Sequence, residues 1–222
     1  VLGAIQPPVE IVFLCQPNNP TGQAADRALM RRILAKCEAV GALLAVDECF
    51  LDFLPDGEAL TMKPELAAHG GLFILKAFTK LYGMAGVRLG YGLCADAALL
   101  ERMRRAGQPW AVSSLAQAAG LAALTQRDYV RQVRALIETE RPYLLAGLRA
   151  LGLRAIAGRA NYLLFRADET LGERLEARGA LIRRCGNYPG LDAGWYRTAV
   201  RTETENRQLL ALLAETLPEV TR

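Results

Sequence analysis

The sequence predicts an α/β fold in which a mostly parallel sheet with flanking helices is followed by a small C-terminal α+β domain. Three observations lead to this prediction. Short apolar runs that suit buried strands alternate with helix-like patterns, the runs end in turn residues, and the strands become shorter after Gly152. Hydrophobic residues make up 52% of the 222 residues, which provides for a sizeable core and excludes a disordered chain.

The first elements form a βαβ pattern. Ile11–Cys15 is an apolar run that stops at Gln16-Pro17 and suits a buried strand. Apolar residues then recur at helical spacing over residues 26–40, and a second buried strand over residues 43–46 ends at Asp47. Strand, helix and strand in this order predict parallel pairing, because the helix returns the chain to the edge where the first strand began.

The later elements are predicted from the same signals. Strands are expected at residues 72–75 and 89–93, and helices at residues 95–106, 113–125 and 128–151. Pro142 predicts a kink or break in the last helix, because proline lacks the N–H that an interior helical position needs. Beyond it, strands at 162–165, 181–184 and 196–200 alternate with helices at 171–178 and 203–217. We therefore expect two domains, residues 1–150 and residues 151–222.

Charge and cysteine content exclude several classes of protein. The formal net charge of +4 is spread along the chain, which does not favour a nucleic-acid or membrane-surface binder. The five cysteines form no C-x-x-C pair or metal-site spacing, as expected for buried thiols in a reducing compartment. With no signal peptide or membrane-spanning run, we expect a soluble cytoplasmic protein. His69, the only histidine, lies in a polar loop and is expected to be exposed.

Four polar motifs lie in loops next to predicted strands, where open α/β sheets place their ligands. An Asn before Pro offers an amide donor, and a carboxylate at the end of a buried strand needs a cation. A lysine on a rigid loop can attack a carbonyl, and an Arg between glycines suits a phosphate. Each motif alone also fits an ordinary turn, a helix cap, a salt bridge or a surface charge. The motifs are Asn18-Asn19-Pro20-Thr21-Gly22, Asp47-Glu48, Thr79-Lys80 and Gly86-Val87-Arg88-Leu89-Gly90-Tyr91.

Taken together and in this order, the motifs resemble those of one family. Asn19, Asp47, Lys80 and Arg88 match the pattern N-P-T-G, D-E, [ST]-K and G-x-R-x-G-[YF] of fold-type I pyridoxal 5′-phosphate (PLP) enzymes, the aspartate aminotransferase superfamily. The joint match is far more specific than its parts and covers nearly the whole chain. The resemblance implies PLP as the cofactor and a homodimer with its sites at the subunit interface.

The resemblance also implies a role for each matched residue. Lys80 would carry PLP covalently and move the substrate proton, while Asp47 would keep the pyridine nitrogen protonated so that the ring accepts electrons. Asn19 would donate a hydrogen bond to the ring oxygen and lie beside the substrate. Arg88, with Thr79, would hold the cofactor phosphate.

The C-terminal segments resemble the histidinol-phosphate aminotransferase subgroup and, more closely, its threonine-phosphate decarboxylase branch. The matching segments are residues 158–164, 181–191 and 196–201, together with residues 108–113. Phe50 supports the decarboxylase branch, since the aminotransferase branch usually has Tyr there. By this resemblance, Arg197 would bind the substrate carboxylate and Arg183 the substrate phosphate. Arg184 and Arg201 are expected to form surface ion pairs.

The implied activity is PLP-dependent decarboxylation of L-threonine O-3-phosphate to aminopropanol phosphate and CO2, a step of cobalamin biosynthesis. Two alternatives stay open. A histidinol-phosphate-type aminotransferase would use the same residue types, because the outcome depends on which substrate bond stands perpendicular to the cofactor ring. An inactive module of this fold that pairs with another subunit is the second alternative.

Two features depart from the family pattern. Ala77 stands three residues before Lys80, where the family generally has Ser or Thr near the cofactor phosphate, so we expect modestly weaker PLP binding. Before the strand at Ile11–Cys15 the family also carries a long N-terminal part, with a phosphate-cradling loop and an aromatic residue that stacks on the pyridine. We therefore expect a partial pocket, an exposed sheet edge and no activity from this chain unaided. Glu48 is expected to point away from Asp47 and is given no role.

Overall fold

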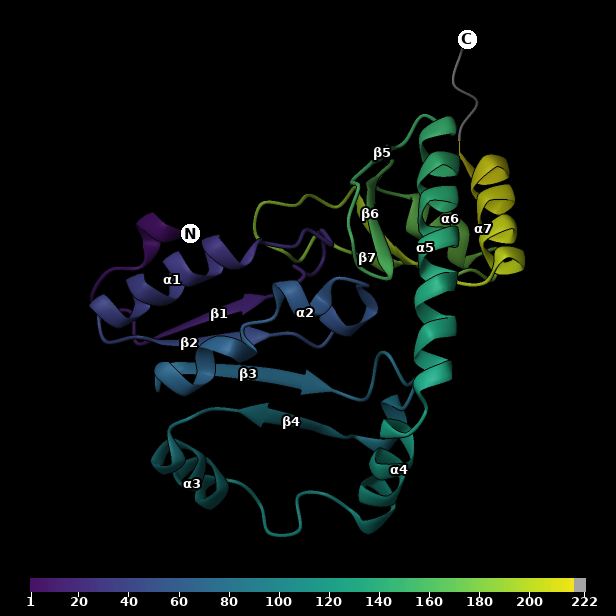
Figure 1. Cartoon of the computed structure of the whole chain (residues 1–222). Helices are drawn as coiled ribbons and strands as arrows, with labels where there is room; N and C mark the ends of the chain where they lie inside the picture. The colour runs from purple at the N-terminus through teal and green to yellow at the C-terminus, as the bar shows by residue number, and fades with distance from the viewer. Residues whose placement is uncertain (218–222) are drawn as a thin grey trace. The chain divides into compact units, whose positions relative to one another are not determined.

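The computed structural model describes residues 1–217, which divide into two compact units (Figure 1). The first unit contains residues 1–17 and 24–131. The second contains residues 18–23 and the chain from residue 132 onward. Each unit is built around its own four-stranded sheet, so the predicted α/β fold class is confirmed.

The first unit holds the mostly parallel sheet, with the strand order β1-β2-β3-β4. β1, β2 and β3 are parallel, and β4 pairs antiparallel with β3. The strands are β1 (Ile11–Cys15), β2 (Leu43–Asp47), β3 (Leu72–Ala77) and β4 (Gly90–Leu93), and the helices are α1 (Arg27–Ala39), α2 (Gly57–Leu60), α3 (Ala97–Ala106) and α4 (Ser114–Leu124). Side chains cap the longer helices: Asp26, Asp96 and Ser113 each accept a hydrogen bond from a first-turn N–H.

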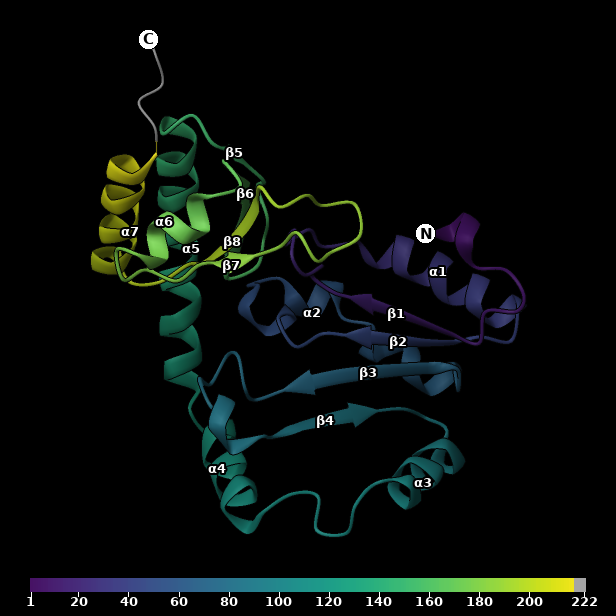
Figure 2. The ribbon, with the colours of Figure 1, turned by 180° about the vertical axis from the view of Figure 1, so that it is seen from behind.

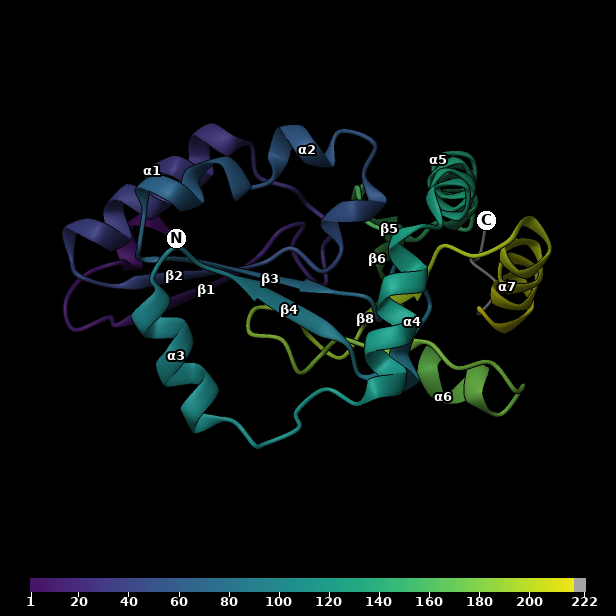
Figure 3. The same cartoon turned by 60° about the horizontal axis from the view of Figure 1, so that its bottom comes forward.

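The two faces of this sheet differ in how they are covered. Figure 3 shows α1 and α2 on one face and α3 on the other. The α1 face carries the core, in which apolar residues of α1 pack on alternate residues of the strands, such as Leu44 and Val46. On the other face, Ile11 and Phe13 of β1 are 51% and 74% exposed. Alternation along β2 places Asp47 on this second face.

The second unit holds an antiparallel sheet with the strand order β5-β6-β8-β7 (Figure 2). Its core includes Leu164, Phe165 and Tyr196, all almost completely buried. α5, whose first residues belong to the first unit, packs closely on α7, where a Cβ on Gly147 would lie 2.4 Å from a Leu210 methyl. The elements are α5 (Arg127–Ala150), β5 (Arg154–Ala155), β6 (Tyr162–Arg166), α6 (Leu171–Glu176), β7 (Arg183–Arg184), β8 (Trp195–Ala199) and α7 (Glu203–Thr216).

Three expectations about local structure are corrected. α5 continues through Pro142 as one helix, because its buried face outweighs the hydrogen bond that proline removes. The strand expected at 181–184 contracts to Arg183–Arg184, which pairs with β8. His69 is half-buried rather than exposed, and its Nδ1 lies 2.6 Å from Glu38 Oε1. No helix within residues 1–217 is both long and apolar enough to cross a membrane.

Candidate active site

In the first unit, Asp47 lies at the carboxyl end of β2, where parallel sheets present their functional groups. Its side chain is half-buried, and Oδ1 accepts a hydrogen bond of 2.9 Å from the Cys49 N–H. That bond orients the carboxylate from within its own loop. Burial, followed by the hydrogen bond and charge of Asp47, raises the pKa of the Cys49 thiol to about 12, although the nearby Lys76 and Lys80 act to lower it.

Lys80 follows β3 and is exposed. Its ammonium lies 5.5 Å from the centroid of the Phe50 ring, within the range of a cation–π contact. Since Lys80 and Asp47 both act electrostatically on the Cys49 thiol, the structure brings these two predicted residues to one end of the sheet. Phe50, the residue that separates the two branches of the resemblance, is therefore a direct neighbour of the candidate catalytic lysine.

Arg88 stands in a left-handed backbone conformation with φ of 57°, between a short 3-10 turn (Ala85–Val87) and β4. This conformation is costly for a residue other than glycine, asparagine or aspartate, and such residues concentrate at functional sites. The guanidinium is exposed and donates one hydrogen bond of 3.0 Å to the Ala85 carbonyl. Thr79, its predicted companion in phosphate binding, is half-buried next to Lys80.

Beneath this end of the sheet lies a group of charges, two of them buried and one half-buried, that the sequence analysis did not assign. Glu48 is fully buried, points away from Asp47 as expected, and accepts hydrogen bonds from Thr61 Oγ1 (2.7 Å) and the Met62 N–H (2.8 Å). Lys76 of β3 places its Nζ 3.3 Å from Glu48 Oε2 and 2.8 Å from Asp52 Oδ1. Burial acts to lower the pKa of Lys76, but Asp52 and Glu48 outweigh it, so the pKa lies above its usual value and the ammonium stays charged.

In the second unit, Asn19 and Arg197 are in direct contact although 178 residues separate them in the chain. Nη1 of Arg197 donates to Asn19 Oδ1 at 2.5 Å, and the guanidinium carbon lies 4.8 Å from the Tyr162 ring centroid. The Tyr188 hydroxyl also donates to Asn19 Oδ1, at 3.4 Å. Because both donors use the oxygen of the amide, its NH2 group faces away from them as a donor.

Three further arginines of this unit were singled out in the sequence analysis. Arg183 is exposed on β7, and its Nη2 donates to Asn187 Oδ1 at 3.3 Å. Arg184 pairs with Glu173 and Glu176, and Arg201 pairs with Glu205, so the predicted ion pairs of Arg184 and Arg201 are confirmed.

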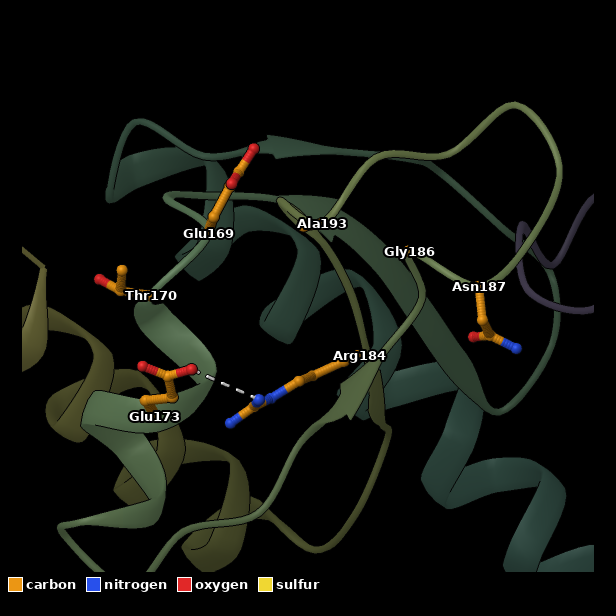
Figure 4. Close-up of a pocket in the computed structure, with 7 residues that line it drawn as sticks. All are labelled: Glu169, Thr170, Glu173, Arg184, Gly186, Asn187 and Ala193. Atoms are coloured by element: carbon orange, nitrogen blue, oxygen red, sulfur yellow. Dashed lines mark ion pairs between the residues drawn. The ribbon is translucent and has the colours of Figure 1, made fainter.

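A cavity of about 450 Å³ opens beside Arg184 (Figure 4). In the figure, Glu173 points toward Arg184, to which it is ion-paired, while Glu169 and Asn187 lie toward opposite ends. The cavity is lined by Glu169, Thr170, Glu173, Arg184, Gly186, Asn187 and Ala193. It contains none of the residues predicted to bind cofactor or substrate. Two of its charged residues, Arg184 and Glu173, are already paired with each other.

Comparison with known proteins identifies the family. The model of the family "Aminotransferase class I and II" matches residues 2–213. This chain belongs to that family. It is 38% identical to the threonine-phosphate decarboxylase of Salmonella typhimurium over 98% of this chain and 60% of that protein. It is 36% identical to a histidinol-phosphate aminotransferase of Methanothermobacter thermautotrophicus over 97% of this chain and 57% of that protein.

A solved structure of the same family contains the expected cofactor. The histidinol-phosphate aminotransferase from Sinorhizobium meliloti, in complex with pyridoxal 5′-phosphate, superposes with a TM-score of 0.79 at 26% identity. The match covers 93% of this chain and 56% of that chain. Family membership implies PLP as the cofactor, as the sequence analysis expected. The chain spans about 60% of the length of the curated relatives it matches.

The residues present fit this cofactor in their chemistry. Lys80 offers an exposed amine, Asp47 an oriented carboxylate at a strand end, and Arg88 an exposed guanidinium. Sequence reasoning missed Tyr188 as a partner of Asn19 and the charges beneath Asp47. The signal for Tyr188 lay in the segment 181–191, already noted for its resemblance. The signal for Lys76 was a charged residue inside an otherwise apolar strand.

Proposed function

We propose that this protein is a PLP-dependent decarboxylase of L-threonine O-3-phosphate. One observation carries the choice of reaction: the candidate catalytic lysine lies against Phe50, in the position where the aminotransferase branch of the resemblance has Tyr. The 38% identity to a threonine-phosphate decarboxylase supports the same choice. PLP, when bound, supplies an electron sink for the electrons released as the substrate bond breaks.

The side chains of the chain provide the remaining roles. Lys80 would hold the cofactor through its amine and would afterwards take up or return a proton at Nζ. Asp47, held by the Cys49 N–H, would keep a proton on the ring nitrogen of the cofactor through a charge-assisted hydrogen bond. Asn19 would donate a hydrogen bond to the ring oxygen of the cofactor through its NH2 group, because Arg197 and Tyr188 both use its Oδ1.

Substrate recognition is assigned to two arginines. Arg197 uses Nη1 for Asn19, and its other N–H groups suit a carboxylate. Arg183, exposed on β7, suits a phosphate. As in the resembling family, we propose that the protein acts as a homodimer.

A histidinol-phosphate-type aminotransferase is the second candidate, and the 36% identity to one such enzyme favours it. The two candidate activities differ in whether turnover requires an amino acceptor. A decarboxylase releases CO2 from L-threonine phosphate with no 2-oxo acid present, whereas an aminotransferase turns over histidinol phosphate only when 2-oxoglutarate is supplied.

Attachment of PLP to Lys80 is the part of this proposal that the chain allows to be tested directly, since the chain spans about 60% of its curated relatives. The chain has four lysines, Lys36, Lys63, Lys76 and Lys80, so borohydride fixation and peptide mapping identify the modified residue. We expect the fixed label on Lys80. Label shared between Lys36 and Lys63 would contradict the assignment and leave the inactive module as the better description.

A further inference from the structure

The charged groups beneath Asp47 contact one another, and two of them, Glu48 and Lys76, are buried. The Glu48 carboxylate accepts hydrogen bonds from Thr61 and Met62 and pairs with Lys76, whose side chain is 3% exposed. Lys76 also pairs with Asp52 in the turn Leu51–Phe53. We call Glu48, Asp52, Thr61 and Lys76 the Lys76 cluster. Buried ionic groups are costly to desolvate, so this cluster needs an explanation beyond stability.

The order of residues along the chain suggests an explanation for the Lys76 cluster. Glu48 and Asp52 stand at the two ends of a short segment, and Phe50 stands in its middle. Lys76 therefore contacts both ends of the segment that presents the Phe50 ring to the Lys80 ammonium. The Glu48 N–H also donates to the Leu75 carbonyl at 3.0 Å, which joins the start of the segment to β3.

The same segment also orients the Asp47 side chain. The Asp47 carboxylate accepts its hydrogen bond from the Cys49 N–H, one residue after Glu48. Because Cys49 precedes Phe50 directly, a shift of the segment would move both the Phe50 ring and the N–H that orients the Asp47 carboxylate. Functional groups must be held to about 0.5 Å by packing and by hydrogen bonds from the residues behind them.

We propose that Lys76 is a positioning residue for Lys80, fixing through Glu48 and Asp52 the segment 47–52 that presents Asp47 and Phe50 to it. The inference rests on the proposed function only in treating Lys80 as the residue that carries the cofactor. Lys76 itself touches neither cofactor nor substrate in this proposal.

The first test needs no cofactor and uses Cys49 as a reporter of the segment. The alkylation rate of Cys49 by iodoacetamide is measured relative to that of Cys94 in the wild type, Lys76→Met and Lys76→Arg, with Lys63→Met as the surface control. Loss of the Lys76 charge alone raises the thiol pKa further and slows alkylation. Release of the segment exposes the thiol to water, so we expect Lys76→Met to speed alkylation by about tenfold or more.

The charge-conserving variant Lys76→Arg is expected to restore the alkylation rate of Cys49. Lys76→Arg keeps a cation for Glu48 and Asp52, and we expect its Cys49 rate to stay within about twofold of the wild type. Lys63→Met removes a half-buried lysine whose Nζ pairs with Glu58, and it is expected to leave the Cys49 rate unchanged. An unchanged or slower Cys49 in Lys76→Met overturns the proposal. If Lys76→Met does not fold, the double variant Glu48→Gln/Lys76→Met, which removes both charges, is judged by the same rate.

The second test measures Lys80 itself. PLP is added, fixed with borohydride, and the ratio of label on Lys80 to label on Lys36 is determined well below the melting temperature of each variant. We expect this ratio to fall about tenfold in Lys76→Met and to recover in Lys76→Arg. A role in stability alone lowers the melting temperature and leaves the ratio unchanged, which would overturn the proposal.

The two tests also separate this inference from the proposed function. If the wild type shows no preference for Lys80, the cofactor assignment fails, and the Cys49 rate alone decides whether Lys76 holds the segment. If the wild type labels Lys80 and Lys76→Met labels it equally well, the cofactor assignment stands and the positioning role fails.

Discussion

The two units hold their candidate residues in different ways. In the second unit, Arg197 is bonded to Asn19 and lies over the Tyr162 ring, so side-chain partners orient both polar groups. In the first unit, Lys80 and Arg88 are exposed. The Lys80 ammonium contacts the Phe50 ring, and Arg88 donates to the backbone carbonyl of Ala85. The buried support for that unit lies on the opposite face of the sheet, in the Lys76 cluster. Polar groups of a candidate site can thus be oriented by side chains that contact them directly. In the proposal for Lys76, they are instead oriented by buried contacts beneath the loop that carries them.

The largest effect is expected when one candidate residue is removed from each unit in turn. Lys80→Ala removes the only amine assigned to PLP, and we expect complete loss of site-specific borohydride-fixed label. Arg197→Ala changes the second unit and is expected to retain label on Lys80 while losing affinity for a carboxylate ligand. Peptide mapping of both variants checks this. Retention of a single strongly labelled lysine in Lys80→Ala would contradict it.

Core substitutions test whether each unit has its own stability. Phe165, fully buried in the second unit, and Leu44, fully buried in the first, give a matched pair. We expect Phe165→Ala to cost about 3–5 kcal/mol and Leu44→Ala about 2–5 kcal/mol of unfolding free energy. Hydrogen exchange should show the loss of protection within the unit that carries the change. Equal loss in both units would mean that the chain unfolds as one cooperative structure.

The Lys76 cluster makes the first unit sensitive to alkaline pH. The folded-state pKa of Lys76 lies above its ordinary value of 10.5, so its contribution to stability is complete below that pH. The contribution is lost as the pH rises through the folded-state pKa. We expect Lys76→Met to cost about 3 kcal/mol near neutrality, because Glu48 is left without its cation. Denaturant titrations should show this difference shrinking at high pH, and a constant difference would refute the assignment.

The smallest effect concerns the start of α7 in the second unit. Thr202 and Glu205 form a capping box, and the hydrogen bond from Thr202 lowers the pKa of Glu205. A lowered pKa contributes stability above the ordinary carboxyl pKa, and that contribution is lost as the pH falls through the folded-state value. We expect Thr202→Ala to cost about 1 kcal/mol. Thermal melts at neutral and acid pH should show the cost shrinking in acid, and Thr198→Ala on β8 provides a comparison outside the cap.

Much of the fold could be predicted because its signals are local. The run Ile11–Cys15 was predicted with the bounds of β1, and α1 and β2 agree within one or two residues. Pro142 misled the prediction because proline acts locally, while the buried residues Ile137, Leu144 and Leu148 that stabilise α5 depend on tertiary packing.

The candidate site was predictable only in its motifs. Asn19 and Lys80 stand in recognisable loops, and the sequence therefore names them. The contact between Asn19 and Tyr188 joins residues 169 apart, and the pair of Glu48 and Lys76 joins neighbouring strands. Such pairs depend on how segments distant in the sequence pack together, which no local pattern in a single sequence reveals.

The high pKa of the Cys49 thiol has a consequence for chemical selectivity. Thiolates add readily to aldehydes, and PLP is an aldehyde, so a reactive thiol near Lys80 would compete with the lysine amine for it. With a pKa of about 12, roughly one Cys49 side chain in 10⁵ is ionised at pH 7. Burial beside Asp47 thus suppresses the competing nucleophile, which favours the proposed capture of the aldehyde by the Lys80 amine.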